Sequence, residues 1–442
     1  MNIVAMASAY GVGAISVIRL GGKDAYEIAM KLCRTALTPR HAHLKKLYSQ
    51  NDELLDEAIV IYFKAPFSYT GEDLVEFQTH GGLVVANLII DELLKLGARV
   101  ANPGEFTKIA LLNDKIDLAK AESISALINA KSEGAAKILA RAMSGEISEF
   151  VENLRSELIT ILAHCEVCID YAEEDLPTDI LDGVKFKLTK AIQRLENIVK
   201  FSLSRQGLID GVKIAIIGKP NVGKSSLLNA LLHYNRAIVS DIAGTTRDTV
   251  EEQIKIGSHI ARIIDTAGIR DNAGDIEKIG IEYSKRAAND ADIIVCVFDR
   301  SAKSDNHDTQ ILEFLNLMNK KIIFVLNKSD LSAKFDLNLD KFDAKIIELS
   351  AKIDTKPLFD ELENLLNLDQ TNEIILSSNR QIIATQNALN ALNLALEKLS
   401  ESELEIFAKE INNAIKFIGQ ITRPMENSEL LDAVFGEFCL GK

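Results

Sequence analysis

The stretch that decides the fold of this chain is GKPNVGKS, residues 218–225, which matches the pattern G-x-x-x-x-G-K-[ST]. It follows an apolar, strand-like run at 212–217 and leads into SLLNALL, residues 226–232, which is a good helix start. The glycines let backbone N–H groups wrap around phosphate oxygens at a helix N-terminus, where the helix dipole favours an anion. A glycine-rich turn without a nucleotide is the alternative, and the flanking strand and helix argue against it. The pattern therefore predicts a phosphate site in which Lys224 reaches the β- and γ-phosphates and Ser225 binds Mg2+.

Three further short motifs follow in chain order at predicted strand ends: DTAG at 265–268, NKSD at 327–330 and SAK at 350–352. The first Asp would hold Mg2+ through a water molecule, and the Gly N–H of the same motif would meet the γ-phosphate. The carboxylate of Asp330 would accept two hydrogen bonds from guanine N1 and N2, which adenine cannot offer. Each motif alone is compatible with an ordinary strand-end loop. In this order they predict a guanine-nucleotide hydrolase.

The apolar runs around these motifs predict the fold class. Helical patterns separate strand-like runs at 212–217, 260–264, 293–298, 322–326 and 346–349, as a doubly wound, mostly parallel sheet requires. The first hundred residues mix short β-branched runs with turn signals, whereas Gly and Pro are sparse in the two segments that flank the sheet. We therefore expect a multidomain protein of α/β and α type. Its domains would be an N-terminal α/β domain at 1–115, a helical domain at 116–208 and 372–442, and an inserted P-loop GTPase domain at 211–370.

Composition narrows the class of protein further. The chain has 442 residues, of which 47% are hydrophobic and 26% charged, which is ordinary for a globular protein. No apolar run is long enough to cross a bilayer, and the N-terminal run at 14–18 is predicted to be a buried first strand. Five thinly spread cysteines argue against a disulfide framework and favour a reducing, cytoplasmic location. The net charge of −14 excludes binding of nucleic acid by bulk electrostatics, so a local patch or a partner must supply positive charge.

The residues that would accelerate hydrolysis are less evident. Small GTPases commonly place a Gln directly after the D-x-x-G motif, and here that position is Ile269, which cannot orient water. The segment GTTRD at 244–248 offers Thr246 as a second Mg2+ ligand in a stretch that can sense the γ-phosphate. Arg270 is a candidate for charge stabilisation, with a surface ion pair as the alternative. Asn221 could help to coordinate a monovalent cation that does the work of an arginine finger.

Together with the C-terminal residues FCLGK at 438–442, these motifs resemble those of the tRNA modification GTPases of the MnmE (TrmE) family over nearly the whole chain. The resemblance implies that K+ activates hydrolysis when two GTPase domains meet. It also implies that Glu277 orients the attacking water, although spacing alone favours a solvated residue at a helix start. The implied K+ ligands are Asn221, Thr245 and the carbonyls of Ser240 and Ile242.

Taken together, the motifs and the resemblance give a set of nucleotide-binding residues, with Ser225 and Thr246 as the Mg2+ ligands. The predicted set is Asn221, Val222, Gly223, Lys224, Ser225, Ser226, Ser240, Asp241, Ile242, Ala243, Gly244, Thr245, Thr246, Asp265, Thr266, Ala267, Gly268, Asn327, Lys328, Asp330, Ser350, Ala351 and Lys352. The predicted catalytic residues are Glu277, Lys224, Arg270 and Cys439.

The resemblance also implies a cofactor site outside the GTPase domain, for 5,10-methylene- or 5-formyl-tetrahydrofolate. An Arg or Lys suits the glutamate carboxylate of folate, and a Glu suits the donor edge of its pterin. Without the resemblance, the N-terminal motifs would be taken as turns and caps, and a cysteine near the terminus as inert. The implied folate-binding residues are Arg19, Glu76, Lys115 and Lys442, with Cys439 taking part in the modification.

The function implied by the resemblance is modification of C5 of the wobble uridine, U34, of tRNA to a (carboxymethyl)aminomethyl-uridine. A homodimer would act with a flavin-dependent partner of the MnmG (GidA) type, which would supply much of the grip on tRNA. One alternative is a regulatory or ribosome-assembly GTPase without modification chemistry. Such proteins usually carry a basic RNA-binding appendage, and neither flank here is strongly basic. A folate-binding protein with a vestigial GTPase is a third possibility, which the intact GTPase motifs argue against.

Overall fold

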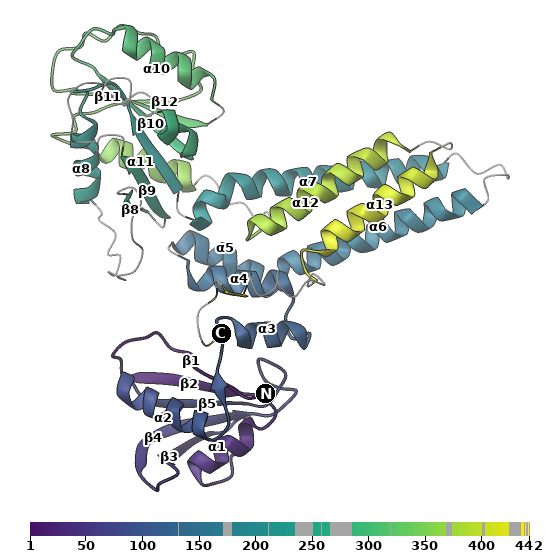
Figure 1. Ribbon diagram of the computed structural model, residues 1–442. Coiled ribbons are helices and arrows are strands. Elements are labelled where there is room, and N and C mark those ends of the chain that lie inside the picture. The colour runs from purple at the N-terminus through teal and green to yellow at the C-terminus, as the bar shows by residue number, and fades with distance from the viewer. Residues whose placement is uncertain are drawn as a thin grey trace. The chain divides into compact units, whose positions relative to one another are not determined.

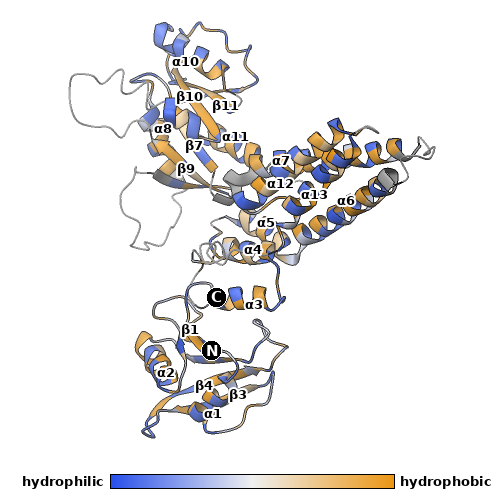
Figure 2. Cartoon of the chain, turned by 45° about the vertical axis from the view of Figure 1, so that its right-hand side comes forward, coloured by the Kyte–Doolittle hydropathy of each residue, from blue (hydrophilic) through white to orange (hydrophobic). Residues whose placement is uncertain are grey.

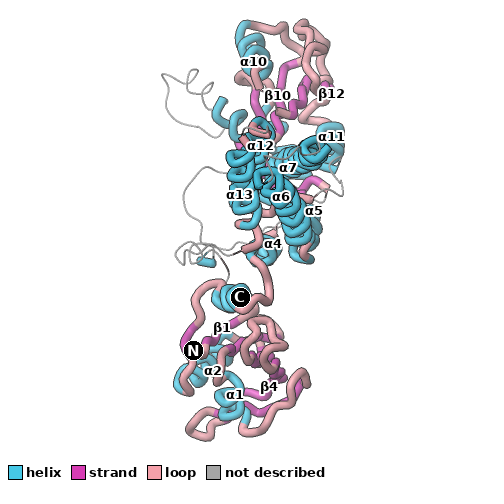
Figure 3. The backbone as a smooth tube through the Cα atoms, turned by 90° about the vertical axis from the view of Figure 1, so that its right-hand side faces the viewer, coloured by secondary structure: helices cyan, strands magenta, loops and turns pink. Residues whose placement is uncertain are grey.

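The computed structural model describes two compact units, each shown in Figure 1 and, by secondary structure, in Figure 3. The first unit comprises Met1–Ser125, Arg141–Val199 and Leu376–Lys442, and the second comprises Ala126–Ala140 and Lys200–Ile375. The second unit thus takes in residues 126–140, which the sequence analysis assigned to the helical domain; the predicted domain boundaries remain predictions. The described residues are 1–130, 132–170, 179–210, 212–234, 251–257, 259–265, 285–318, 320–367, 374–399, 403–423, 435, 436, 438 and 441. Within these ranges, no helix has the length and apolar character needed to cross a membrane.

The first unit begins with a six-stranded sheet in the order β3-β4-β5-β2-β1-β6. Neighbouring strands are antiparallel except β1 and β6, which are parallel. Alternate residues of the strands face a core that helices α1 and α2 cover from one side (Figure 1). The elements are β1 (Ile3–Met6), β2 (Ile15–Gly21), α1 (Ala25–Cys33), β3 (Ala42–Tyr48), β4 (Leu54–Phe63), β5 (Leu74–His80), α2 (Leu83–Lys95) and β6 (Arg99–Val100).

The run at 14–18 forms a strand from Ile15 onward, as predicted, but this strand is the second and not the first. The first strand is Ile3–Met6, whose four residues are all buried. A strand of this length with no polar alternation gives no period that a sequence pattern can recognise.

The described residues from 105 to 210 and from 379 to 419 are mostly helical. Helix α13 buries Leu404, Phe407, Ile411, Ala414 and Ile418, which recur at three- and four-residue spacing. Helices α6, α12 and α13 run side by side in Figures 1 and 2. The helices are α3 (Glu105–Leu112), α4 (Leu118–Ile128), α5 (Glu133–Ser144), α6 (Glu146–Asp170), α7 (Asp179–Asp210), α12 (Asn379–Glu397) and α13 (Leu404–Gly419).

A partly buried charged group fixes how the segment after 374 joins the helices before 200. The guanidinium of Arg380, in the first turn of α12, donates to Glu122 on α4 at 2.6 and 2.9 Å. The same guanidinium donates to the carbonyls of Gln420 and Ile421 at the end of α13, at 2.5 and 3.0 Å. One side chain therefore connects the start of one helix with the C-terminal end of another and with a helix more than 250 residues away in sequence.

The second unit contains a six-stranded sheet in the order β12-β11-β10-β7-β9-β8. Five strands are parallel, and β8 pairs antiparallel with β9 at one edge. One face packs against α8 and α11, and the other against α10 and the helical residues 285–290. The elements are β7 (Val212–Ile217), α8 (Lys224–Tyr234), β8 (Glu251–Ile256), β9 (His259–Asp265), β10 (Ile293–Asp299), α10 (Asn306–Asn316), β11 (Lys321–Asn327), β12 (Lys345–Glu348) and α11 (Lys356–Asn367).

This arrangement confirms the predicted doubly wound, mostly parallel sheet. The central strand β10 is buried from Ile293 to Phe298 and is apolar along its length in Figure 2, as a strand covered on both faces must be. Strand β8 was not predicted from the sequence. Of its described side chains, those of residues 253–256, only Ile254 and Ile256 are in the core cluster, because an edge strand has fewer neighbours to bury against.

Three cysteines of the described chain, Cys33, Cys165 and Cys296, are buried and not joined in disulfides. Cys165 lies within 3.6 Å of the Leu404 carbonyl, between α6 and the start of α13. Burial raises the pKa of the Cys33 thiol to about 12, and burial also raises the pKa of Cys296. These thiols act as small core residues rather than as ligands or nucleophiles.

Candidate nucleotide-binding site

The loop between β7 and α8 has a backbone that two glycines make possible. Gly218 and Gly223 have φ angles of +148° and +99°. A Cβ on Gly218 would lie 2.3 Å from the Val297 carbonyl oxygen, and one on Gly223 would lie 2.2 Å from Nδ2 of Asn327. Asn221, between them, has a left-handed φ of +65°, which Asn adopts more readily than most residues. The loop thus bends closely around the ends of neighbouring strands and directs its backbone to the start of a helix.

Side chains of the segment after β11 fasten this loop from the side. The Asn327 amide donates to the Val222 carbonyl at 2.8 Å and accepts from the Ala351 N–H at 2.9 Å. The Lys328 ammonium donates to the Asn221 carbonyl at 3.0 Å. The structure therefore brings together parts of three predicted motifs at the C-terminal ends of parallel strands, where open α/β sheets bind ligands.

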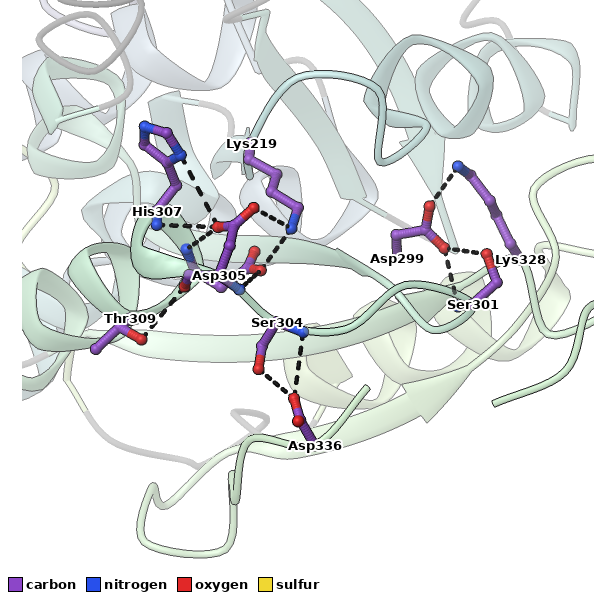
Figure 4. Close-up of polar contacts among 10 residues, drawn as sticks. Lys219, Asp299, Ser301, Ser304, Asp305, His307, Thr309, Lys328 and Asp336 are labelled. Atoms are coloured by element: carbon purple, nitrogen blue, oxygen red, sulfur yellow. Dashed lines mark hydrogen bonds and ion pairs between the residues drawn. The ribbon is translucent and has the colours of Figure 1, made fainter. Parts of the chain in front are cut away.

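Asp299, the last residue of β10, contributes a contact that the sequence analysis missed. Its carboxylate accepts from Lys328 Nζ at 2.5 Å and from the Ser301 hydroxyl at 2.6 Å, as Figure 4 shows. Burial would raise the pKa of Asp299, but these hydrogen bonds outweigh it and hold the pKa below its ordinary value. One sequence feature could have pointed to Asp299: it ends a strand, and the neighbouring strand ends at the NKSD motif.

Lys224 and the two serines after it occupy the first turn of α8. The Lys224 ammonium donates to the Gly218 and Lys219 carbonyls at 2.8 and 2.9 Å, so it lies against the first residues of the loop. Ser225 and Ser226 are exposed. An anion at this helix end would meet backbone N–H groups, the positive end of the helix dipole and an ammonium group.

The predicted base-recognition residues lie at the ends of β11 and β12. A hydrogen bond from the Ser350 hydroxyl holds the pKa of Asp330 below its ordinary value, and the positive charges of Lys352 and Lys328 lower it further. The exposed Asp330 is therefore an ionised, acceptor-only group at neutral pH. The Ser329 N–H donates to the Leu349 carbonyl at 3.1 Å and joins the two segments.

Several predicted residues fall outside the described parts of the chain. These are residues 240–246, 266–268, Arg270, Glu277, Cys439 and Lys442, and for Asp265 only the backbone is described. Their proposed roles stay predictions.

Arg19 and Glu76, predicted for the folate site, are direct neighbours on β2 and β5. Arg19 Nη2 and Nε donate to Glu76 Oε1 at 2.8 and 3.0 Å. The Arg19 guanidinium also lies 5.6 Å from the ring centres of both Tyr69 and Phe106, which the sequence analysis did not identify. Lys115 is exposed and lies beside Gly71.

The described residues of the tail lie against the same unit. Arg19 Nη1 donates to the Gly441 carbonyl at 3.2 Å. Gly441 has a φ of +89°, and a Cβ there would lie 2.3 Å from the Met6 carbonyl oxygen. Phe438 packs in a cluster with Leu111 and Leu118. Residues on either side of Cys439 are thus in contact with the N-terminal part of the chain.

The close approach of Gly223 to Asn327 gives a first testable prediction. Gly223→Ala would force a left-handed backbone on a residue with a side chain and push against the amide of Asn327. Strain of about 1–3 kcal/mol should weaken binding of a fluorescent guanine nucleotide by roughly 10- to 100-fold. The matched control is Gly183→Ala, where a Cβ would meet nothing within 4 Å. Unchanged affinity in Gly223→Ala would show that the loop does not hold the nucleotide.

Known proteins match this chain over its whole length. A family model described as the GTP-binding protein TrmE N-terminus matches residues 2–115, and one described as the MnmE helical domain matches residues 118–439. The tRNA modification GTPase MnmE of Campylobacter fetus subsp. fetus (strain 82-40) is 66% identical over 443 residues, which is 100% of both chains. The proteins of the same name from Campylobacter concisus (strain 13826) and Aliarcobacter butzleri (strain RM4018) are 56% and 53% identical, over 100% of this chain and 99% of theirs. The chain therefore belongs to the MnmE family of tRNA modification GTPases.

Proposed function

We propose that this chain binds GTP with Mg2+, hydrolyses it, and uses the hydrolysis in a modification of tRNA. The observation that carries the GTP part is the connection of the phosphate loop to the base-recognition segments through Asn327 and Lys328. Because one amide joins the Val222 carbonyl and the Ala351 N–H, the phosphate end and the base end of the site are held in register.

Selection of guanine would rest on Asp330. Its ionised carboxylate matches the two donors of the guanine edge, and an adenine in the same place would leave a charged acceptor unpaired.

Ser225 and Thr246 would bind the Mg2+, with Asp265 acting through water. Ile216 on β7 lies opposite Asp265 on β9. The backbone of Asp265 therefore lies at the C-terminal ends of the strands, where the phosphate loop starts. Hydroxyl and carboxylate oxygens are ligands that Mg2+ prefers. A bound Mg2+ would neutralise charge that develops on the phosphates.

Activation of hydrolysis would come from K+, held by Asn221, Thr245 and the carbonyls of Ser240 and Ile242. The left-handed backbone of Asn221 and the absence of a Gln at position 269 support this part of the proposal. A cation there would supply positive charge beside the phosphates. Glu277 would orient the attacking water, and Arg270 is a further candidate for charge stabilisation.

The first unit would bind the tetrahydrofolate carrier through Arg19, Glu76, Lys115 and Lys442. Support comes from the partly buried Arg19–Glu76 pair, the two aromatic rings beside it and the Gly441 carbonyl that Arg19 contacts. A pterin is a flat ring with donors along one edge, which suits a carboxylate flanked by aromatic groups. Cys439, two residues from Gly441, would take part in transfer of the one-carbon unit.

The modified group would be C5 of U34 in tRNA, which the chain would reach as a homodimer with an MnmG/GidA-type flavoprotein. The net charge of −14 supports a division of labour in which the partner supplies most of the contacts with tRNA. Co-purification of a flavin-containing protein with the full chain, and light scattering of the chain alone, test the partner and the dimer; the absence of either would contradict that part.

Substitution of the base-recognition carboxylate tests the nucleotide. Asp330→Asn removes a charged acceptor of two hydrogen bonds, so the Kd for GDP should rise by at least about 100-fold and the preference over ADP should shrink. The control is Asp340→Asn, which neutralises an exposed carboxylate of the same unit. Native-like GDP affinity in Asp330→Asn, measured by fluorescence titration, would contradict guanine selection by this residue.

Turnover in different salts tests the cation. With a preorganised positive charge beside the phosphates, GTP hydrolysis should be at least about tenfold faster in K+ than in Na+ at equal ionic strength. Asn221→Gly keeps the left-handed backbone but removes the amide, so it should lose this difference. Equal rates in both salts for the native chain would rule out the cation mechanism.

Mass analysis of tRNA nucleosides tests the modification. Cells that lack this chain should lose the aminomethyl-type group at U34, and a copy carrying Arg19→Met should fail to restore it. Arg40→Met, which removes an exposed guanidinium that donates to the Phe67 carbonyl, is the matched control and should restore it. An unchanged nucleoside profile in cells without the chain would instead favour a regulatory or ribosome-assembly GTPase.

A further inference from the structure

Lys219 is the second residue of the phosphate loop, at a position where the pattern G-x-x-x-x-G-K-[ST] allows any residue. Its side chain is only 15% exposed and its ammonium donates to Asp308 at 2.6 Å and to Asp305 at 2.9 Å (Figure 4 shows the Asp305 contact). Burial would lower the pKa of Lys219, but the hydrogen bonds to the two carboxylates raise the pKa above its ordinary value. The ammonium is therefore charged and directed to the start of α10.

Asp308 is the stronger of the two partners because it is buried. Its side chain is 1% exposed, and its Oδ2 also accepts from the Asp305 N–H at 3.1 Å as part of the capping box of α10. Within the described ranges, Asp308 Oδ1 is buried without a hydrogen-bond partner. A capping box needs only an acceptor at this position, so the negative charge is required by Lys219 rather than by the helix.

The backbone of Lys219 connects this pair to the phosphate-binding lysine. The Lys219 carbonyl accepts from Lys224 Nζ at 2.9 Å, next to the Gly218 carbonyl at 2.8 Å. Gly218 before it is conformationally permissive, and Pro220 after it has a fixed φ. Without a side-chain anchor, the peptide at Lys219 could therefore move about its glycine end and carry the Lys224 ammonium with it.

We propose that Asp308 is a positioning residue for GTP hydrolysis, which acts through Lys219 to fix the ammonium of Lys224 over the phosphates. The inference rests on the proposed GTPase function and adds a residue outside its recognised motifs. Asp299 plays the corresponding part at Asn221, through Lys328, so one anchor starts from the last residue of β10 and the other from α10, the next helix.

The expected effect is larger on turnover than on affinity. Several backbone N–H groups share the binding of the phosphates in the ground state, whereas the transition state depends on charges placed before reaction. A shift of one such charge by about 1 Å costs up to about 100-fold in rate. Loss of the anchor should thus lower kcat by roughly tenfold and change the Kd for GDP by less than about threefold.

The test compares single-turnover GTP hydrolysis and GDP binding by the full chain and its variants. Asp308→Asn keeps the shape and the capping acceptor but removes the charge, and Lys219→Met removes the cation. Each should lower kcat by roughly tenfold, and the double variant should lose no more than the worse single one, because both remove the same interaction. Unchanged kcat in the single variants, or a roughly 100-fold loss in the double variant, would overturn the proposal.

The matched control is Asp336→Asn, which neutralises an exposed carboxylate bound to Ser304 in the same segment (Figure 4). It should keep native kcat; an equal loss there would mean that general loosening of the segment is responsible, and would overturn the proposal. If Asp308→Asn does not fold, the activities of Lys219→Arg and Lys219→Met are compared instead to test the proposal. Activity retained by Arg and lost by Met supports the anchor, and equal activity of the two overturns it.

The outcomes also separate this inference from the function on which it rests. If the native chain hydrolyses GTP and the variants have the same kcat, only the role of Asp308 is overturned. Absence of turnover in the native chain would overturn the GTPase function and the anchor together.

Discussion

The structure of the second unit depends on one constraint: the loop after β7 must keep an unusual backbone path while it stays close to two other strands, β10 and β11. Two glycines permit the path, because a side chain at either would strike the Val297 carbonyl or the Asn327 amide. Hydrogen bonds from Asn327 and Lys328 then stabilise this backbone path over the other conformations that glycine allows. Permissive backbone and specific side-chain contacts are thus combined, which is how a loop becomes preorganised without a ligand.

The phosphate loop is surrounded by positively charged side chains, although the chain as a whole is acidic. The protein carries a net charge of −14, yet three lysines, Lys219, Lys224 and Lys328, gather around the phosphate loop. Lys328 is paired with the carboxylate of Asp299 at the end of β10, and Lys219 with that of Asp308 in α10. Lys224 donates to backbone carbonyls. Such pairing lets cations accumulate beside an anion site without repelling one another, and it fixes where each one lies.

Much of this fold follows from the sequence, because apolar runs between motifs predicted five of the six strands of the second sheet to within two residues at either end. The edge strand β8 and the short strand β1 were missed. The four residues of β1 show no alternation, and alternation in β8 is limited to residues 253–256. Asp299 and Asp308 were missed for another reason: their lysine partners are 29 and 89 residues away in sequence, and only the folded sheet brings them together. Arg19 and Glu76 came from family resemblance alone, and the residues of 240–246 and Glu277 stay predictions.

The three buried thiols have a practical consequence for studying this enzyme in motion. A thiolate reacts with maleimides and the neutral thiol hardly does, so high pKa values and burial protect Cys33 and Cys296 from such reagents, and burial alone shields Cys165. A cysteine introduced at an exposed position would therefore outcompete these three for a fluorophore or spin label. Site-directed spectroscopy therefore does not require the removal of these three cysteines.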